Sequence, residues 1–375
     1  MRKQLVIGIM NGTSLDGVDF VLTEIHRPSS AKKNPKTKFI AEKSFQFSSE
    51  MKFQLIKAAR HELQVKDLAR LHHDLGRFYA ECYKKLPAKF KKAHLIGLHG
   101  QTVYHEAPRA TLQIGESSYL STVSGKTVVS DFRTADLSLG GQGAPIATLF
   151  HEKVLAGTIK TKSSVAIHNL GGISNLSLIG KKGVLLSFDT GPANMLLDLY
   201  IQSSTNGQTA YDDNGERASR GHVQSQLLSR MLEHEYLKSS PPKSCGREEF
   251  GESFLNRFKP EMVNLNLEDA LCTLTAFTAT TIVQAYRNFA KPMPEKIIFC
   301  GGGANNLFLL KRIQALLPNV KIQTSTELGW PVSSIEGAAF ALLAAYRIWE
   351  IPSNYPKTTG AKSPALLGKI TRSIL

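Results

Sequence analysis

The N-terminal stretch LVIGIMNGTSLDGVDFVLTEI (5–25) carries the clearest secondary-structure pattern of this chain. Its first part, 5–10, is apolar and β-branched, NGTSLDG (11–17) has the composition of a turn, and residues 18–25 alternate between apolar and polar. This order predicts a strand, a tight turn and a second strand. Small residues in such a turn let backbone N–H groups approach a phosphate closely, although a plain hairpin turn explains the same residues.

A second stretch, SVAIHNLGGISNLSLI (164–179), has the same strand–turn–strand order. Two strand–turn–strand segments of this kind predict two similar α/β domains, although the match between them is short enough to arise by chance. No low-complexity linker separates the two halves of the chain. The remaining patterns predict further strands at 39–47, 93–105, 126–132, 184–189 and 296–303, and helices over 50–86 and 337–346.

The composition is that of a folded protein. The 375 residues are 42% hydrophobic and 21% charged, which excludes a wholly disordered chain. At about 150 residues per domain, the length predicts two to three domains. The longest apolar stretch, 337–346, is about half a membrane span, and the N-terminal apolar run is too short for a signal peptide. The widely spaced cysteines form no CxxC pattern and are typical of reduced thiols. We therefore expect a soluble cytoplasmic protein.

The chain carries a net charge of +15. Such a surplus fits acidic ligands, whether phosphates, carboxylates or nucleic acid, and does not choose among them. Basic runs such as Lys89, Lys91 and Lys92 have no interleaved aromatic residues, which favours solvated surface over a nucleic-acid interface. Neither HExxH nor GxSxG occurs, so these zinc-protease and serine-hydrolase motifs are excluded.

Three glycine-containing turns offer backbone to a nucleotide. In the first, Thr13 and Ser14 add hydroxyl donors and Asp16 could orient Mg²⁺ through water, but the Gly-Lys-Ser/Thr of a Walker loop is missing. The second, Asn-Leu-Gly-Gly at 169–172, could meet the same phosphates. The third, 301–303, ends a strand before a helix, which suits a base or ribose, without the GxGxxG spacing of a Rossmann site. Each alone also fits an ordinary tight turn, so the three together carry more weight than any one.

Three charged side chains occupy positions suited to chemistry. Asp189 is expected at the end of an apolar strand, and a carboxylate at the carboxyl end of a strand points into the crevice where α/β proteins bind ligands. A turn or N-cap role is the alternative. Glu336 heads an apolar helix, where it either faces a ligand or complements the helix dipole. Arg133, between Asp131 and Asp136, either binds a ligand carboxylate through two hydrogen bonds or makes a local salt bridge.

Two histidines flank a glycine-containing turn. His99 and His105 lie on either side of Gly-Gln-Thr at 100–102. Each could face a ligand, but a core or surface histidine is the more common explanation of such a residue.

Taken in order, these motifs resemble the anhydro-N-acetylmuramic acid kinase family over nearly the whole chain. The blocks that carry the resemblance are GIMNGTSLDGVD (8–19), GLHGQTVYH (97–105), SDFRTADLSLGGQGAP (130–145), NLGGISNLS (169–177), FDTGPANMLLD (188–198), YDDNGERASRG (211–221), PPKSCGREEF (241–250), TLTAFTA (273–279), CGGGANN (300–306) and EGAAFALLA (336–344).

The resemblance implies an α/β fold with two related domains of the actin, sugar-kinase and heat-shock-protein ATPase type, closing around a central cleft. It implies an ATP-dependent kinase with Mg²⁺ that consumes 1,6-anhydro-N-acetylmuramic acid and water, opens the anhydro bridge and releases N-acetylmuramic acid 6-phosphate. The family serves peptidoglycan recycling, and its members are cytoplasmic and commonly dimeric. No nucleic-acid or membrane partner is expected. We expect a first domain at 1–135 with 340–375 and a second at 136–339.

The resemblance and the motifs together assign site residues. Asp189 is the expected general base on water, and Glu336 is expected to help orient that water. The sugar is expected to contact Gln101, Arg133 and Asn194, with Arg133 on its lactyl carboxylate. Residues expected to bind the nucleotide are Gly12, Thr13, Ser14, Leu15, Asp16, Gly17, Val18, Asp19, Gly171, Gly172, Gly301, Gly302 and Gly303, with Asp16 also serving Mg²⁺ through water.

The sequence departs from the family at a few positions. Asn11 stands where Ser is frequent, Gly337 replaces a usual Ala, and Ser333 and Ser334 lie in a stretch that is often acidic. Rival interpretations are a different sugar or acid kinase on the same fold, a nucleotide-dependent binding protein without enzymatic activity, and a nucleic-acid binder suggested only by the net charge.

Overall fold

The computed structural model describes residues 3–12, 15, 17–31, 33–159 and 161–373. The chain forms two compact units, Met1–Gly157 with Ser334–Leu375, and Thr158–Ser333. Residues 136–157 and 334–339, which the sequence interpretation assigned to the second domain, belong to the first unit. The reason is packing, because Asp136 accepts hydrogen bonds from the C-terminal segment and the helix that follows Ser334 lies against the first sheet.

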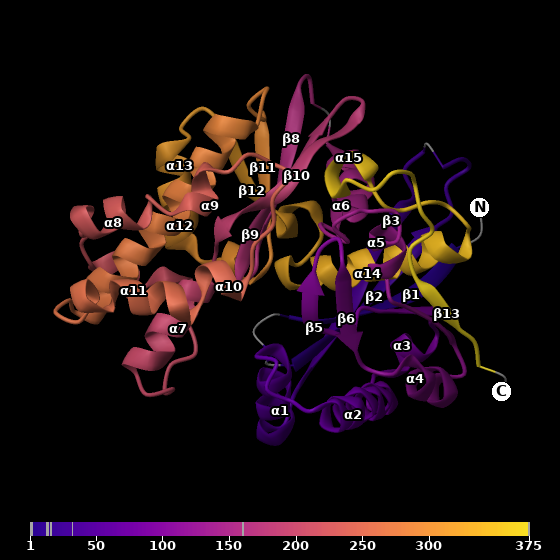
Figure 1. The fold of residues 1–375 in the computed structure, drawn as a ribbon. Coiled ribbons are helices and arrows are strands. Elements are labelled where there is room, and N and C mark those ends of the chain that lie inside the picture. Colours follow the sequence, from indigo (N-terminus) through magenta and orange to yellow (C-terminus); the bar gives the residue numbers. More distant parts are fainter. Residues whose placement is uncertain (1–2, 13–14, 16, 32, 160, 374–375) are drawn as a thin grey trace. The chain divides into compact units, whose positions relative to one another are not determined.

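The first unit is built on a six-stranded sheet with the order β13-β7-β4-β1-β2-β3. The two hairpin-linked pairs β1–β2 and β2–β3 are antiparallel, whereas β4 and β7 run parallel to β1. A smaller hairpin, β5–β6, stands beside it (Figure 1). The strands are β1 (Lys3–Asn11), β2 (Gly17–His26), β3 (Lys36–Gln46), β4 (Leu95–Leu98), β5 (Gln101–Glu106), β6 (Ala110–Ile114), β7 (Thr127–Ser130) and β13 (Lys369–Thr371).

The second unit repeats this topology in a five-stranded sheet with the order β10-β9-β8-β11-β12. Again the first three strands along the chain are antiparallel, and the next two are parallel to the first. The predicted α/β class with two related domains is confirmed. The strands are β8 (Ser164–Leu170), β9 (Ile173–Gly180), β10 (Gly183–Pro192), β11 (Lys296–Cys300) and β12 (Lys321–Thr324).

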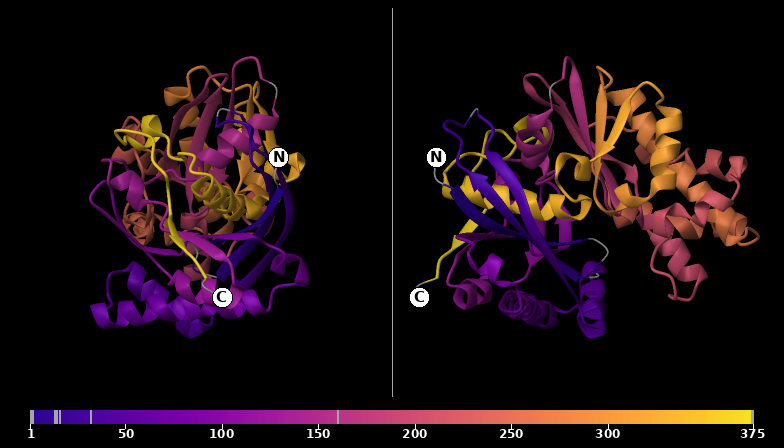
Figure 2. Two further views of the ribbon diagram at one scale, coloured as in Figure 1. Left: turned by 90° about the vertical axis from the view of Figure 1, so that its right-hand side faces the viewer. Right: turned by 180° about the vertical axis from the view of Figure 1, so that it is seen from behind.

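Helices cover both faces of the first sheet, as the two orientations in Figure 2 show. Alternation along β1 places Ile7 and Ile9 in a core with Leu71, Leu75 and Tyr79 of α2, while Gly8 between them faces α14. The helical region predicted over 50–86 consists of two helices separated at 60–64. The helices of this unit are α1 (Ser49–Ala59), α2 (Val65–Lys84), α3 (Ala88–Lys91), α4 (Ser117–Ser124), α5 (Thr134–Leu137), α6 (Thr148–Phe150), α14 (Ile335–Ile348) and α15 (Pro356–Thr359).

The second sheet packs against the long helix α12 and its neighbour α13. Ile297 and Phe299 of β11 share a core with Ile282 of α12 and with Leu309 and Ile313 of α13. Among the described residues, no helix combines the length and hydropathy that a membrane span requires. The helices of this unit are α7 (Met195–Ser204), α8 (Ser225–Met231), α9 (Glu235–Lys238), α10 (Arg247–Phe250), α11 (Glu252–Met262), α12 (Leu267–Phe289) and α13 (Leu307–Leu316).

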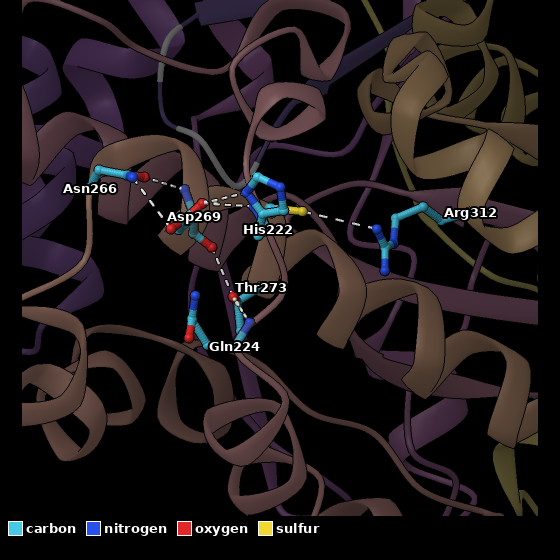
Figure 3. Close-up of polar contacts among 7 residues, drawn as sticks. His222, Gln224, Asn266, Asp269, Thr273 and Arg312 are labelled. Carbon is cyan, nitrogen blue, oxygen red and sulfur yellow. Dashed lines mark hydrogen bonds and ion pairs between the residues drawn. The ribbon is translucent and has the colours of Figure 1, made fainter.

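The segment before α8 is fastened to the first turns of α12 (Figure 3). Asn266 caps α12 by accepting from the Asp269 N–H at 2.7 Å, and the Asp269 carboxylate accepts from the His222 N–H at 2.7 Å. The Thr273 hydroxyl accepts from the Gln224 N–H at 3.0 Å. These bonds hold residues 222–224, which belong to no helix or strand, against the buried helix α12.

Helix α14 approaches the first sheet at glycines. A Cβ on Gly8 of β1 would overlap the Gly337 carbonyl oxygen and lie 2.7 Å from the Ala341 nitrogen, and one on Gly97 of β4 would overlap the Phe340 carbonyl oxygen. Backbone meets backbone at these points, so no neighbouring side chain can move aside to make room.

We expect Gly8→Ala to destabilise the first unit, because its methyl group can be accommodated only by moving α14. Overpacking of this kind costs about 1–3 kcal/mol or more. The free energy of unfolding from urea titration measures the effect. Gly157→Ala is the matched control, since its Cβ would meet mainly the exposed end of the Asn34 side chain. We expect the control to stay within about 0.5 kcal/mol of the parent, and an equally stable Gly8→Ala protein would contradict the prediction.

Candidate active site

In the first unit, the parallel strands β1, β4 and β7 end at one edge of the sheet. Asn11 is the last residue of β1 and Gly12 follows it, His99 and Gln101 follow β4, and Arg133 follows β7. The His99 N–H donates to the Ile9 carbonyl at 3.0 Å, which fixes the β4 end beside the β1 end. The carboxyl edge of parallel strands is where α/β proteins bind ligands. The fold therefore gathers three predicted segments that are far apart in sequence.

Two buried amide oxygens at this edge lack partners within the described residues. The Gln101 Oε1 and the Asn11 Oδ1 accept no hydrogen bond, although their side chains are only 5% and 2% exposed. Leaving a buried acceptor unpaired costs about 1–3 kcal/mol. A ligand donor at this edge would remove that cost, so the arrangement supports Gln101 as a binding residue. Asn11 was noticed in the sequence only as a departure from the family.

Arg133 donates hydrogen bonds to two uncharged acceptors. Its Nη1 donates to the Gly143 carbonyl at 2.9 Å, and its Nη2 donates to His99 Nε2 at 3.1 Å. The acid on one side, Asp131, pairs with Lys369 at 2.7 Å. The acid on the other side, Asp136, is 1% exposed and accepts from the Gly143 N–H at 2.8 Å.

The first phosphate turn is only partly described. Thr13, Ser14 and Asp16, which carry the predicted hydroxyl donors and the predicted Mg²⁺ contact, lie outside the described residues. The side chains of Leu15 and Val18 are buried in the core, so these two residues can contact a nucleotide only through their backbone.

On the second strand of the hairpin, Gly17 and Asp19 pair with β3. A Cβ on Gly17 would overlap the Phe45 carbonyl oxygen, so the glycine is needed for strand packing whatever it binds. Asp19 accepts from the Ser44 hydroxyl at 2.5 Å, and burial raises the pKa of its carboxyl group. Ser44 comes from a strand in which the sequence offered no sign of a site.

In the second unit, β8, β10 and β11 end at the corresponding edge. The strand registers align Cys300, Asn169, Asn175 and Asp189 in one row across β11, β8, β9 and β10. Residues in one row of a sheet project from the same face. Asp189 thus lies beside Asn175 on the neighbouring strand and two strands from Asn169, at the start of the second glycine turn. No sequence pattern indicated Asn175 at this position, because only the register reveals it.

The second and third glycine turns meet around Asn194. The Gly171 carbonyl accepts from the Asn194 N–H at 3.0 Å, and the Gly172 carbonyl accepts from the Ala193 N–H at 2.9 Å. A Cβ on Gly303 would lie 2.8 Å from Asn194 Oδ1. Asn194, predicted to bind sugar, therefore lies between the two turns predicted to bind nucleotide.

The third turn leaves backbone open. Gly301 has φ of 79°, a left-handed conformation that favours glycine. A Cβ on Gly302 would meet nothing nearer than the Asn194 Nδ2 at 4.0 Å. The space beside Gly302 fits the close approach of a ligand to the main chain.

Asp189 is clamped by the segment 236–245. Its N–H donates to the Lys243 carbonyl at 3.3 Å, its carbonyl accepts from the Tyr236 hydroxyl at 2.6 Å, and its Oδ2 accepts from the Cys245 N–H at 3.1 Å. The prediction that Asp189 ends its strand was wrong, because β10 continues to Pro192 through an irregularity between Asp189 and Gly191.

Lys243 anchors the clamp. Its ammonium group donates to the Tyr236 carbonyl at 2.9 Å and lies 4.5 Å from the Tyr236 ring centroid and 5.2 Å from that of Phe289. Burial, together with the nearby Asp189 charge, raises the pKa of the Tyr236 hydroxyl and of the Cys245 thiol. Both groups therefore stay protonated, and the Tyr236 hydroxyl remains a donor. The block PPKSCGREEF contains most of this clamp but gives no local sign of its target.

Glu336 lies in the first turn of α14, in the first unit, whereas Asp189 belongs to the second. The N-cap residue of α14 is Ser334. The other departure beside Glu336, Gly337, faces Val21, since a Cβ there would overlap the Val21 side chain. The missing methyl group is thus explained by packing between α14 and β2.

A sequence profile of the family described as "Anhydro-N-acetylmuramic acid kinase" matches residues 4–373. The chain belongs to this family. It is therefore an enzyme and a kinase, and the resemblance seen in the motifs is confirmed. Relatives named anhydro-N-acetylmuramic acid kinase include that of Picosynechococcus sp., which is 38% identical over 97% of this chain and 98% of the relative. That of Haemophilus influenzae is 35% identical over 99% of this chain and 98% of the relative.

Two solved structures resemble this kinase at low TM-scores. The activator of 2-hydroxyisocaproyl-CoA dehydratase from Clostridium difficile with bound ADPNP has a TM-score of 0.43 at 13% identity, covering 92% of this chain and 96% of that chain. The inorganic polyphosphate/ATP-glucomannokinase from Arthrobacter sp. has a TM-score of 0.38 at 14% identity, covering 92% and 99%. Scores this low support no conclusion about ligands.

We expect Tyr236→Phe to slow turnover by about 2–10-fold, the effect of one lost hydrogen bond of about 0.5–1.5 kcal/mol on the position of Asp189. The Michaelis constant for the nucleotide should not change. Steady-state kinetics with the purified kinase measures both parameters.

Tyr211→Phe is the matched control for this clamp variant, because Tyr211 is 60% exposed and lies outside the clamp. The control should keep full activity. Unchanged turnover in Tyr236→Phe would mean that the clamp does not position Asp189.

Proposed function

We propose that this kinase converts 1,6-anhydro-N-acetylmuramic acid, ATP and water into N-acetylmuramic acid 6-phosphate and ADP. Family membership over residues 4–373 supports the substrate. The observation that carries the mechanism is Asp189, a carboxylate held by the 236–245 clamp at the carboxyl edge of the second sheet. A carboxylate fixed at such an edge is suited to accept a proton from water.

The substrate dictates why water is required. A sugar kinase normally phosphorylates a free hydroxyl, but in the anhydro sugar the oxygen on carbon 6 is already bonded to carbon 1. Asp189 accepts a proton as water attacks carbon 1, and the bond between carbon 1 and the bridge oxygen breaks. The bridge oxygen takes the γ-phosphoryl group, and ADP leaves. The base acts as in an inverting glycoside hydrolase, with phosphoryl transfer in place of a proton to the leaving oxygen. Glu336 helps to orient the water.

ATP and sugar are assigned to the predicted residues. Gly12, Gly17, Gly171 and Gly172 offer backbone to the phosphates, and the turn at 301–303 offers backbone to the ribose or base, where space beside Gly302 supports the assignment. Gln101 and Asn194 bind the sugar. Arg133 binds its lactyl carboxylate, because a guanidinium matches the geometry of a carboxylate.

The expected Mg²⁺ fits this site only as an ion shared with the phosphates. Among the described residues, no group of three acidic, histidine or cysteine side chains could hold a metal. Mg²⁺ is usually bound by one or two carboxylates together with substrate phosphates, a role open to Asp19 and to Asp16 outside the described residues. When bound, the ion would neutralise charge on the phosphates.

The place of the reaction in the cell follows from the family resemblance alone. We propose that the enzyme is cytoplasmic, serves peptidoglycan recycling and acts as a homodimer. A different sugar kinase on the same fold is the main alternative. It would phosphorylate open-chain sugars and leave the anhydro sugar intact, which product analysis with both substrates distinguishes.

Asp189→Asn should lower turnover by roughly 10²–10⁴-fold, the usual contribution of one general base. Nucleotide affinity from calorimetry should stay near that of the parent. Asp213→Asn, an exposed change of the same charge in the same unit, is the control and should keep full activity. Near-normal turnover in Asp189→Asn would remove the proposed base.

A reaction in heavy-oxygen water tests which bond water makes. Solvent oxygen should enter at carbon 1 and be absent from the phosphoester linkage, because the bridge oxygen becomes the phosphorylated one. The product must be trapped early and compared with an exchange control, since free sugars exchange their anomeric oxygen. Label in the phosphoester oxygen at the first turnover would mean that water attacks elsewhere.

A further inference from the structure

In the hydrogen bond between Arg133 and His99, the donor and the acceptor can be assigned. A guanidinium has donors only, so His99 Nε2, which lies 3.1 Å from Arg133 Nη2, must act as the acceptor. The proton of the neutral imidazole is then on Nδ1. The His99 side chain is 5% exposed, and its ring lies 4.6 Å from that of Phe340, between centroids. Burial and the Arg133 charge hold the pKa of His99 well below its usual range, so the imidazole stays neutral.

The second acceptor of Arg133 is equally fixed. The Gly143 carbonyl accepts from Nη1 at 2.9 Å, while the Gly143 N–H donates to Asp136 Oδ2 at 2.8 Å. Asp136 Oδ1 accepts from Asn354 Nδ2 at 2.7 Å and from the Thr359 hydroxyl at 2.8 Å. The buried carboxylate thus ties Gly143 to the C-terminal segment. With one acceptor on each terminal nitrogen, the plane of the guanidinium is set before any ligand binds.

We propose that His99 is a positioning residue that makes this kinase specific for sugars carrying a carboxylate. The inference rests on the proposed function, in which Arg133 binds the lactyl carboxylate of the substrate. An arginine side chain loses considerable rotamer freedom when it is held in place. The hydrogen bond to His99 fixes the Arg133 side chain before the substrate binds, so binding does not carry the cost in conformational entropy. An acid in its place would also orient Arg133, but its charge would compete with the carboxylate of the substrate.

The test compares two anhydro sugars. One is 1,6-anhydro-N-acetylmuramic acid, and the other is 1,6-anhydro-N-acetylglucosamine, which has a hydroxyl in place of the lactyl ether. His99→Phe keeps an aromatic ring beside Phe340 and removes the acceptor. We expect it to lower kcat/KM for the muramic sugar by about tenfold through KM, the effect of one weakened charge-assisted hydrogen bond. For the glucosamine sugar the change should stay within about twofold.

Two further variants separate this inference from the proposed function. Arg133→Met should lower kcat/KM for the muramic sugar, relative to the glucosamine sugar, more than His99→Phe does. The double variant should have the same ratio of kcat/KM values as Arg133→Met alone, since the two side chains act as a unit. His99→Gln, whose amide oxygen can replace the acceptor, should restore most of the lost discrimination. It also serves as the test if His99→Phe fails to fold, as judged by its thermal melting curve.

Each outcome has a separate meaning. If Arg133→Met lowers kcat/KM equally for both sugars, the carboxylate contact of the proposed function is wrong, and the inference falls with it. If Arg133→Met discriminates while His99→Phe treats both sugars like the parent, the proposed function stands and the role of His99 is overturned. An equal loss for both sugars in His99→Phe and His99→Gln would mean that His99 serves only the fold.

Discussion

The close approach of α14 to the first sheet is the constraint on which that unit depends. Backbone atoms of the helix lie against Gly8 of β1 and Gly97 of β4, where any side chain would overlap a carbonyl oxygen. Such contacts leave no freedom for repacking, because main-chain atoms cannot change rotamer. The depth of the helix in turn sets the position of Glu336 in its first turn. It also explains Gly337, since a methyl group there would overlap Val21.

The repeated topology gives each unit a carboxyl edge where its polar residues gather. In the first unit this edge carries Arg133 with two neutral acceptors, and in the second it carries Asp189 within the 236–245 clamp. The two charges are treated differently. Arg133 donates to two uncharged acceptors, the Gly143 carbonyl and the His99 ring, whereas the Asp189 carboxylate accepts a backbone N–H.

A chain of buried hydrogen bonds lies next to the carboxyl edge of the second sheet. His168 contacts the Tyr286 hydroxyl at 2.8 Å and the Ser174 hydroxyl at 2.5 Å, and Ser174 contacts the Thr190 hydroxyl at 2.7 Å. These residues adjoin the second phosphate turn and Asp189 along the chain. Satisfied polar groups in a core fix strand positions more specifically than apolar contacts do. The chain therefore links the strand that carries Asp189 to the strands that flank the turn.

Local patterns in the sequence predicted the α/β class, the two hairpins, the strand that carries Asp189 and the head of the helix that carries Glu336. Apolar alternation, turn residues and glycines form patterns within a few neighbouring positions, so these elements can be predicted from the sequence. The hydrogen-bond partners of the charged residues depend on contacts that form only in the folded protein. Tyr236 reaches Asp189, His99 reaches Arg133 and Thr359 reaches Asp136 across 47, 34 and 223 positions. Such partners are brought together by strand order and register, and no local pattern encodes a contact that forms only after the sheet does.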